Sequence, residues 1–362
     1  MSNPKANIYI SADELRSIAM EILKKEGVPE GDAFITADCL VKANLRGIDT
    51  HGVIRLKVYV DRLRAGGNNP TPHIHVIHES ATTAVMDGDN GLGPTGGVRA
   101  MEKAIQKAQN CGVGIVTMRH SNHYGTAAFY AMMALEHNMI GVSMTNVLAG
   151  MPPTGGRQAR IGNNPFAVAF PAGEELPIVF DAATSLSSWG KVFLAAQTGT
   201  LLEEDCFLDK DGNPTVKPED VISGGLLLPI AGYKGYGMAL CIGILTGLLA
   251  DSSFDIDVPH PYKYLDVPGD NSFFMAAIQI NQFVPIEQFK KRIDETIRLI
   301  KNTPLASNSE RIYLPGEKEY IAEREHRAKG IPLNRETVEE LRTLAQEAGV
   351  SYARREAMLC RN

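Results

Sequence analysis

The sequence predicts an α/β protein with an N-terminal helical unit, a body of alternating strands and helices, and a helical C-terminal region. Three observations support this fold class. Apolar residues recur at helical spacing over the first ~70 residues. From about residue 74, short apolar segments alternate with longer helical periods, and amphipathic helices return after residue 285. We expect the three parts to span residues 1–75, 76–255 and 256–362.

The composition is that of a soluble globular protein with a substantial core. The 362-residue chain is 44% hydrophobic and 22% charged, with a formal net charge of −6 and no long basic run. Nucleic acid and anionic membranes are therefore not expected as partners. The cysteines form no CxxC pair, which favours reduced thiols and a cytoplasmic location over a zinc knuckle or a disulfide framework.

Two further patterns bear on location. The N-terminal residues lack the apolar segment of a signal peptide. The longest apolar stretch, Met238 to Ala250, is 13 residues long. That length is too short to span a bilayer, so we expect a buried helix there.

Capping signals and apolar spacing define the N-terminal unit. Ser11 and Glu14 form a capping box, so a helix is expected from about residue 12. A second helix should follow Pro29, and a third should run from about His51 to the glycine pair at 66–67. The functional segment described below thus falls where the second and third helices meet.

The body is predicted from alternating short and long apolar segments. Strands are expected at residues 82–86, 112–118, 140–145, 166–170, 177–180 and 273–280. Helices are expected at residues 97–110, 125–137, 189–197, 237–250, 286–301 and 335–348.

The segment Arg46-Gly-Ile-Asp-Thr50-His51-Gly-Val-Ile-Arg55 carries the most specific chemistry. If the chain is helical from His51 onward, His51 and Arg55 share one face. Histidine exchanges a proton near neutral pH, and arginine can hold a carboxylate with two parallel hydrogen bonds. These two groups suit chemistry at the carbon next to a carboxylate, as in a 2-keto or 2-hydroxy acid. The alternative is a solvated His and Arg at the start of a surface helix.

Gly91-Leu-Gly93-Pro-Thr-Gly96 matches the GxGxxG pattern of dinucleotide-binding loops, but its context does not. The next strand ends in Met118-Arg119-His120 without the acidic residue that would hold a ribose, and Pro94 interrupts the loop. We therefore interpret this segment as a glycine-rich turn.

Two other segments could contact a ligand. In Ser121-Asn-His123-Tyr-Gly125, a strand meets a helix, so His123 is either a second acid/base group or cofactor contact, or an incidental member of a capping cluster. Lys234 and Gly235 lie where an apolar helix begins, a position that favours an anion. The glycines near residues 155 and 162 allow phosphate binding, although plain turns explain them more simply.

No metal site is expected. His73, His75 and His78 have no carboxylate or thiol near them in the sequence, so we interpret them as a solvated face. The segment from Asp209 to Pro214 has the spacing of a calcium loop, but Asp220 stands where the bidentate glutamate belongs. We interpret it as a turn.

In their order and spacing, these segments resemble the malate/L-lactate dehydrogenase family that lacks a Rossmann domain. That family includes ureidoglycolate dehydrogenase, sulfolactate dehydrogenase, diketogulonate reductase and cyclic-imine reductases. The similarity runs from about residue 8 to residue 320. It rests on the segments around His51 and His123, on 155–156 through 162–165, on 181–185, on 190–191, on 232–237 and on 315–317.

The resemblance implies a non-Rossmann α/β body that binds NAD or NADP, and a homodimer with its active site near the subunit interface. It implies that His51 exchanges the proton, that Arg55 holds the substrate carboxylate, and that His123 lies beside the nicotinamide and competes for the acid/base role. Thr50 stands where the family usually has serine, His120 where asparagine is common, and Asn163 where threonine is usual. The cofactor would be lined by Asp181, Ala182, Ala183, Thr184, Lys234, Gly235, Gly316 and Glu317.

The expected activity is hydride transfer between a nicotinamide and a 2-keto or (S)-2-hydroxy acid of the malate or L-lactate type. Four substrate classes remain as alternatives within the family: ureidoglycolate, sulfolactate, diketogulonate and cyclic-imine carboxylates. A protein that binds a nucleotide or anion without turnover is the alternative from another class, and the presence of His51, Arg55 and His123 argues against it.

Overall fold

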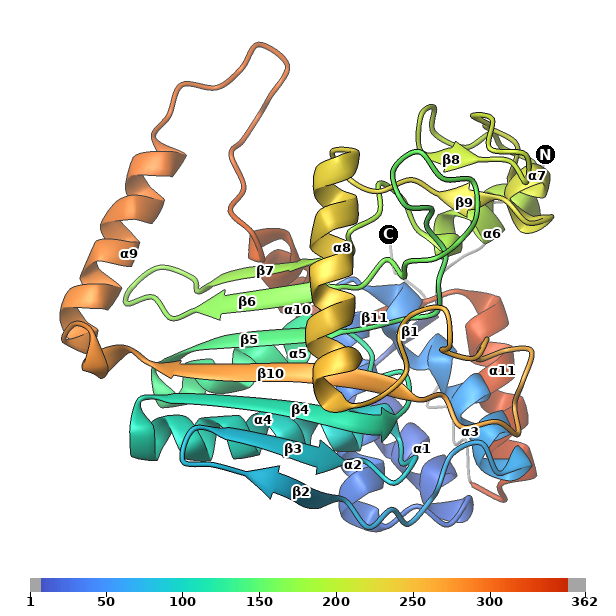
Figure 1. Ribbon diagram of the computed structural model, residues 1–362, viewed down its shortest axis with the longest axis horizontal. Helices are drawn as coiled ribbons and strands as arrows, with labels where there is room; N and C mark the ends of the chain where they lie inside the picture. The colour runs from blue at the N-terminus through green and yellow to red at the C-terminus, as the bar shows by residue number, and fades with distance from the viewer. Residues whose placement is uncertain (1–7, 351–362) are drawn as a thin grey trace.

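The computed structural model describes residues 8–350, which form a seven-stranded sheet flanked by helices, with a small lobe beside one end (Figure 1). The α/β fold class is confirmed. Only β3 and β4 pair in parallel, and every other neighbouring pair in this sheet is antiparallel. In sheet order the strands are β2 (His75–Glu79), β3 (Thr83–Asp87), β4 (Val113–Ser121), β10 (Asn271–Gln279), β5 (Met139–Thr145), β6 (Phe166–Phe170) and β7 (Ile178–Ala182).

The N-terminal unit is built on two long helices, α1 (Ala12–Lys25) and α2 (Glu30–Leu45). The predicted cap is present, because the Ser11 hydroxyl accepts a hydrogen bond from the Glu14 amide. A two-stranded sheet joins β1 (Ile8–Ile10) to β11 (Ile331–Leu333), and α11 (Arg335–Glu347) shares a core with α1, α2 and α3. The two ends of the described chain therefore pack together.

The third helix does not begin at His51, as the sequence predicted. Two 3₁₀ turns, η1 (Asp49–His51) and η2 (Val53–Arg55), precede α3 (Leu56–Ala65). Gly52 separates the turns and packs against Asn44, where an added Cβ would lie 2.2 Å from Oδ1. The same oxygen accepts the Val53 amide at 2.8 Å, so that amide is withdrawn from helical pairing. His51 and Arg55 therefore do not share a face of one α-helix.

Helices cover the two faces of the sheet unequally (Figure 1). One face carries α4 (Gly93–Cys111), α5 (Ala127–Ala131) and the turn η3 (Met132–His137). The glycine-rich segment was predicted to be a turn, but from Gly93 onward it forms the first turn of α4. A Cβ at Gly93 would lie 2.2 Å from the Asn122 carbonyl, and one at Gly97 would lie 2.4 Å from the Tyr130 ring. These glycines permit close packing.

The other face is crossed by α8 (Tyr233–Thr246), which continues into η4 (Leu248–Ala250) and packs on β5 and β10. The apolar stretch is longer than the sequence suggested. Tyr233–Ala250 has a mean hydropathy of 1.3 and would suffice by length and composition for a membrane span, and only 39% of it is buried. The prediction of a buried helix is therefore only partly right, because α8 leaves one apolar side uncovered.

The C-terminal part does not form a separate layer. β10 lies at the centre of the sheet between β4 and β5, so the expected boundary at residue 256 cuts through the α/β body. α9 (Ile286–Lys301) projects from one side, and α10 (Glu317–Lys329), which the sequence analysis did not predict, follows a long connection (Figure 1). The small lobe holds α6 (Trp189–Thr198), β8 (Phe207–Leu208), α7 (Pro218–Ile222) and β9 (Leu226–Leu227).

Candidate active site

Two histidines from distant parts of the chain stack on each other at the junction of the N-terminal unit and the sheet. His51 ends η1, and His123 lies in the connection between β4 and α5. Their ring centroids are 5.6 Å apart, with the ring planes inclined by 24°. The structure thus brings together the two candidate acid/base groups of the sequence analysis.

His51 is held by its neighbour in the chain. Its Nδ1 lies 2.9 Å from the Thr50 hydroxyl, so the ring orientation is fixed and Nε2 has no protein partner among the described residues. Burial, reinforced by the Arg55 charge, lowers the pKa of His51 to about 4. The ring is therefore neutral near pH 7 and can accept a proton.

His123 is held by Tyr59, a buried residue of α3 that the sequence analysis did not select. The Tyr59 hydroxyl lies 2.7 Å from His123 Nδ1 and donates to the His123 carbonyl at 3.1 Å. Burial, together with the charges of Arg55 and His51, lowers the pKa of His123 well below its usual value. The only sequence signal for Tyr59 was its spacing, four residues after Arg55 on a helix.

Arg55 presents an open guanidinium to the two rings. Its Nε donates to the Thr50 carbonyl at 2.6 Å, and its Cζ lies 5.8 Å from the centre of the Tyr262 ring. Among the described residues, no carboxylate pairs with Arg55 and no acceptor meets its two Nη atoms within bonding distance. A half-buried cation without a counter-ion, beside two neutral imidazoles, is suited to bind an anion.

The predicted cofactor residues gather around the end of β7. Ala182 and Ala183 are half-buried, and Thr184 is fully buried with a hydroxyl that has no hydrogen-bond partner. Asp181 accepts the Ala128 amide at 2.8 Å, and burial raises the pKa of its carboxyl to about 6. Beyond Thr184 the chain enters α6, where a Cβ at Gly190 would lie 3.2 Å from Thr50 Cγ2. The β7 end is thereby linked to the histidine pair.

Lys234 and Gly235 join this region through Ile230. The Ile230 amide donates to the Thr184 carbonyl at 2.9 Å, and a Cβ at Gly235 would lie 2.0 Å from the Ile230 carbonyl. Lys234 is exposed in the first turn of α8, and no described residue accepts a hydrogen bond from its ammonium. An orphaned buried hydroxyl, a glycine cradle and an unpaired lysine at a helix start fit a phosphate-bearing cofactor such as a nicotinamide dinucleotide.

Gly316 and Glu317 lie on the other side of β7. Gly316 has a left-handed φ of 86°, and an added Cβ would lie 2.9 Å from Val179. The Glu317 carboxylate is already engaged by Lys301, by Arg311 and by the Leu314 amide. Burial alone would raise its pKa, but these contacts outweigh burial and the pKa of Glu317 is lowered. Glu317 therefore braces the connection before α10, and its side chain is not free to hold a ribose.

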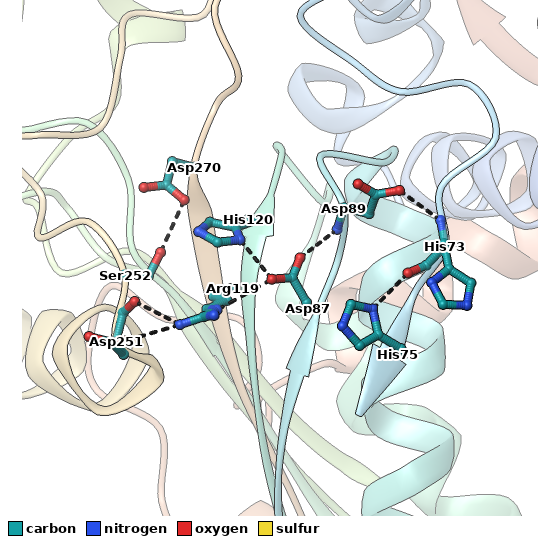
Figure 2. A network of polar contacts seen from close by, with 9 residues as sticks. All are labelled: His73, His75, Asp87, Asp89, Arg119, His120, Asp251, Ser252 and Asp270. Carbon is teal, nitrogen blue, oxygen red and sulfur yellow. Dashed lines mark hydrogen bonds and ion pairs between the residues drawn. The ribbon is translucent and has the colours of Figure 1, made fainter. Parts of the chain in front are cut away.

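A second polar network, which includes neither His51 nor His123, lies where β3 and β4 end (Figure 2). Asp87 contacts His120 Nδ1 at 2.8 Å and Arg119 Nε at 3.4 Å, and Arg119 reaches Asp251. His120 has a left-handed φ of 49°, a conformation that asparagine and histidine tolerate better than most residues. The nearby His73 and His75 are exposed, and no group of three potential metal ligands occurs among residues 8–350.

Comparisons with known proteins identify the family of this chain. A sequence model of the malate/L-lactate dehydrogenase family matches residues 10–342. The malate dehydrogenase of Pyrococcus horikoshii is 42% identical over 351 residues, covering 95% of this chain and 96% of that protein. A solved structure of malate dehydrogenase from the same organism superposes with a TM-score of 0.88 at 40% identity, covering 97% and 99% of the two chains.

Two other relatives broaden the picture. The L-sulfolactate dehydrogenase of Methanocaldococcus jannaschii is 38% identical, with coverage of 95% of this chain and 98% of the relative. The ureidoglycolate dehydrogenase (NAD(+)) of Escherichia coli is 31% identical, with coverage of 90% and 92%. All these matches span nearly the whole of both chains.

Proposed function

Because the chain belongs to the malate/L-lactate dehydrogenase family, we propose that it transfers a hydride between NAD or NADP and C2 of a malate-type 2-keto or (S)-2-hydroxy acid. The observation that carries this proposal is the open Arg55 guanidinium beside two neutral histidines. A 2-keto acid needs one cation for its carboxylate and one proton carrier for its carbonyl oxygen, and this cluster offers both.

Arg55 binds the substrate carboxylate end-on. Since Nε is occupied by the Thr50 carbonyl, the two Nη atoms remain for a bidentate contact. This contact directs C2 and its oxygen toward the imidazoles and fixes the reacting carbon for hydride transfer.

His51 carries the proton. In the oxidation of the hydroxy acid, the neutral imidazole takes the hydroxyl proton at Nε2 as the C–H bond of C2 breaks. In the reduction of the keto acid, the protonated ring returns that proton to the carbonyl oxygen. We assign this role to His51 because the contact of its Nδ1 with the Thr50 hydroxyl leaves Nε2 without a partner among the described residues, whereas the His123 ring is held through its Nδ1 by the buried Tyr59. His123, held in place by Tyr59, then forms one polar side of the substrate site.

The residues at the β7 end would hold the cofactor, which supplies or accepts the hydride when bound. Lys234 and the first turn of α8 suit its pyrophosphate, and the Asp181 carboxylate suits a ribose hydroxyl. Glu317 is excluded from direct contact by its own ion pairs.

The assembly we propose is a homodimer formed through the bare side of the sheet. Val142, Met144, Phe166 and Val168 are half-buried on the face that α8 only partly covers, and Phe180 is 37% exposed beside them. A sheet face that meets water normally carries polar residues, so this apolar face requires a covering layer. A second copy of the chain supplies it.

A reducing compartment, the cytoplasm, fits the thiols. Cys39, Cys111, Cys206 and Cys241 are all free, and no disulfide links them. Cytosolic reductants keep such thiols reduced.

A panel of keto acids tests the activity. Purified protein is mixed with NADH or NADPH and with oxaloacetate, sulfopyruvate or pyruvate, and cofactor oxidation is followed by absorbance. We expect oxaloacetate to be reduced fastest. A sulfopyruvate preference would instead favour the sulfolactate activity suggested by the 38% identical relative. No oxidation with any keto acid would refute the proposal.

The carboxylate clamp is tested by Arg55→Ala. We expect the KM for the keto acid to rise by about 10²-fold, because two charge-assisted hydrogen bonds are lost, while the KM for NADH changes little. Lys57→Ala is the matched control, since Lys57 is an exposed cation two residues away that pairs with Asp61. An unchanged keto-acid KM in Arg55→Ala would show that the clamp lies elsewhere.

A further inference from the structure

The segment between η4 and β10 contributes a wall of the candidate active site. Residues 259–268 belong to this connection, which runs beside α3 (Figure 1). Arg62 of α3 donates to the carbonyls of Tyr264 at 2.9 Å and Val267 at 2.7 Å, with a longer contact to Pro261. None of the segments that carry the family resemblance lies within residues 259–268, so the role of this segment is inferred from its contacts.

The Arg62 side chain holds this segment in place through several hydrogen bonds. Its side chain is 3% exposed, and its bonded acceptors are backbone carbonyls and the side-chain oxygens of Asn68 and Asn122. Asn122 directly precedes His123, and the same Asn122 oxygen also accepts the Gly269 amide at 3.0 Å. One buried guanidinium therefore fixes residues 261–267 relative to the histidine pair.

The segment that Arg62 holds places Tyr262 beside Arg55. The Tyr262 ring centre lies 5.8 Å from Arg55 Cζ, and the residue is 52% exposed. An aromatic ring on one face of a guanidinium leaves the in-plane Nη edge open for a carboxylate. A ring so placed would also shield the guanidinium from water and would lie beside a carboxylate bound to the Nη atoms.

We propose that Tyr262 is a specificity-determining residue that limits the size of the group on C3 of the keto acid, and that Arg62 is its positioning residue. This inference rests on the proposed function of Arg55. The ring orients the guanidinium so that the carboxylate of a short substrate binds in plane, and it blocks the volume that a bulky C3 substituent would need.

The test compares oxaloacetate with phenylpyruvate in three variants. In Tyr262→Ala we expect the KM for oxaloacetate to rise about 3–30-fold, the range that cation–π contacts allow. The substitution also removes the bulk of the ring. The kcat/KM for phenylpyruvate, divided by that for oxaloacetate, should therefore rise at least about tenfold. Tyr262→Phe keeps the ring and should behave as the unmodified protein. Tyr264→Ala is the matched control, because that ring stacks on Lys263 and its backbone carbonyl is retained.

A second variant tests the positioning role. Arg62→Lys keeps the charge and loses the planar fork, so the substrate ratio should shift as in Tyr262→Ala. In the double variant the two effects should not add, because both act through one ring. Additive effects would remove Arg62 from the proposal.

The outcomes separate this inference from the proposed function. Suppose that the unmodified protein reduces oxaloacetate, but that the phenylpyruvate-to-oxaloacetate kcat/KM ratio of Tyr262→Ala stays within twofold of that of Tyr264→Ala. Only the specificity role of Tyr262 is then overturned. If the unmodified protein reduces no keto acid while its fold is intact by circular dichroism, both the proposed function and this inference fail. Because Tyr262 is exposed, its variants should keep the thermal midpoint of the unmodified protein, and a lowered midpoint would contradict its placement.

Discussion

At the scale of single residues, burial rather than residue type makes His51 and His123 useful. An exposed histidine titrates near pH 6.5 and would be partly charged under most cellular conditions. Here the surroundings of His51 and His123 lower both pKa values, and two charged rings 5.6 Å apart beside Arg55 are avoided. A neutral pair is ready to accept the proton of a bound hydroxy acid.

The pH profile of hydroxy-acid oxidation follows from this shift. The pKa of His51 is lowered to about 4, so the neutral base persists on the acid side of its usual range. The kcat/KM for malate should therefore stay level down to about pH 5 and fall as the pH drops through His51's own pKa. A fall centred near pH 6.5 would instead indicate an exposed base.

Replacing the His51 imidazole should greatly reduce turnover and abolish the fall in activity at low pH. In His51→Ala we expect kcat to drop by at least ~10²-fold while NADH still binds, as measured by cofactor fluorescence. His120→Ala is the control, since His120 belongs to the separate network with Asp87 (Figure 2). Near-normal turnover in His51→Ala would transfer the proton role to His123.

At the scale of elements, the break between η1 and η2 positions the site. An uninterrupted helix would place His51 and Arg55 one turn apart on the same face. Instead, Asn44 of α2 binds the Val53 amide with Oδ1 and donates from Nδ2 to Asp49 at 2.6 Å, which holds both turns on the preceding helix. Arg55 can then donate to the Thr50 carbonyl, and its guanidinium turns toward Tyr262.

A methyl group at Gly52 should disturb this arrangement. In Gly52→Ala the new Cβ meets the Asn44 amide group within 2.4 Å, so the Asn44 contacts must shift. We expect a loss of about 1–3 kcal/mol in the free energy of unfolding, measured by denaturant titration, and a parallel loss of activity. Gly31→Ala, in α2 with nothing within 4 Å of its Cβ, should be neutral or slightly stabilising. Equal stability of the two variants would contradict the packing account.

At the scale of the whole molecule, helices cover one face of the sheet but only part of the other. α4 and α5 pack on one face, and alternate residues of β5 and β6 on that side are buried. On the opposite face α8 covers only part, and its own Met238 and Ile244 remain exposed. An exposed apolar surface of this kind is typical of a face that another molecule covers, in line with the proposed homodimer.

A lysine in the centre of the bare face should separate the subunits. We expect light scattering to give a dimer mass for the unmodified protein and a monomer mass for Val168→Lys, because burying an unpaired charge costs several kcal/mol. Ile77→Lys places the same change on an exposed position of β2 and should leave the dimer intact. A monomeric unmodified protein, or a dimeric Val168→Lys, would exclude this interface.

Much of the local structure, and the candidate reactive groups, could be predicted from the sequence. Capping at Ser11 and the apolar period after Pro285 predict helices that the structure contains, since these signals act within a few residues. Proton transfer and carboxylate binding require particular side chains, so the sequence was enough to select His51, Arg55 and His123 as candidates. Which distant segments meet could not be predicted from the sequence and follows from long-range packing. Strand pairing placed β10 in the centre of the sheet, and packing brought Tyr59 and Tyr262 to the site, because contacts between residues far apart in the chain leave no periodic trace in it.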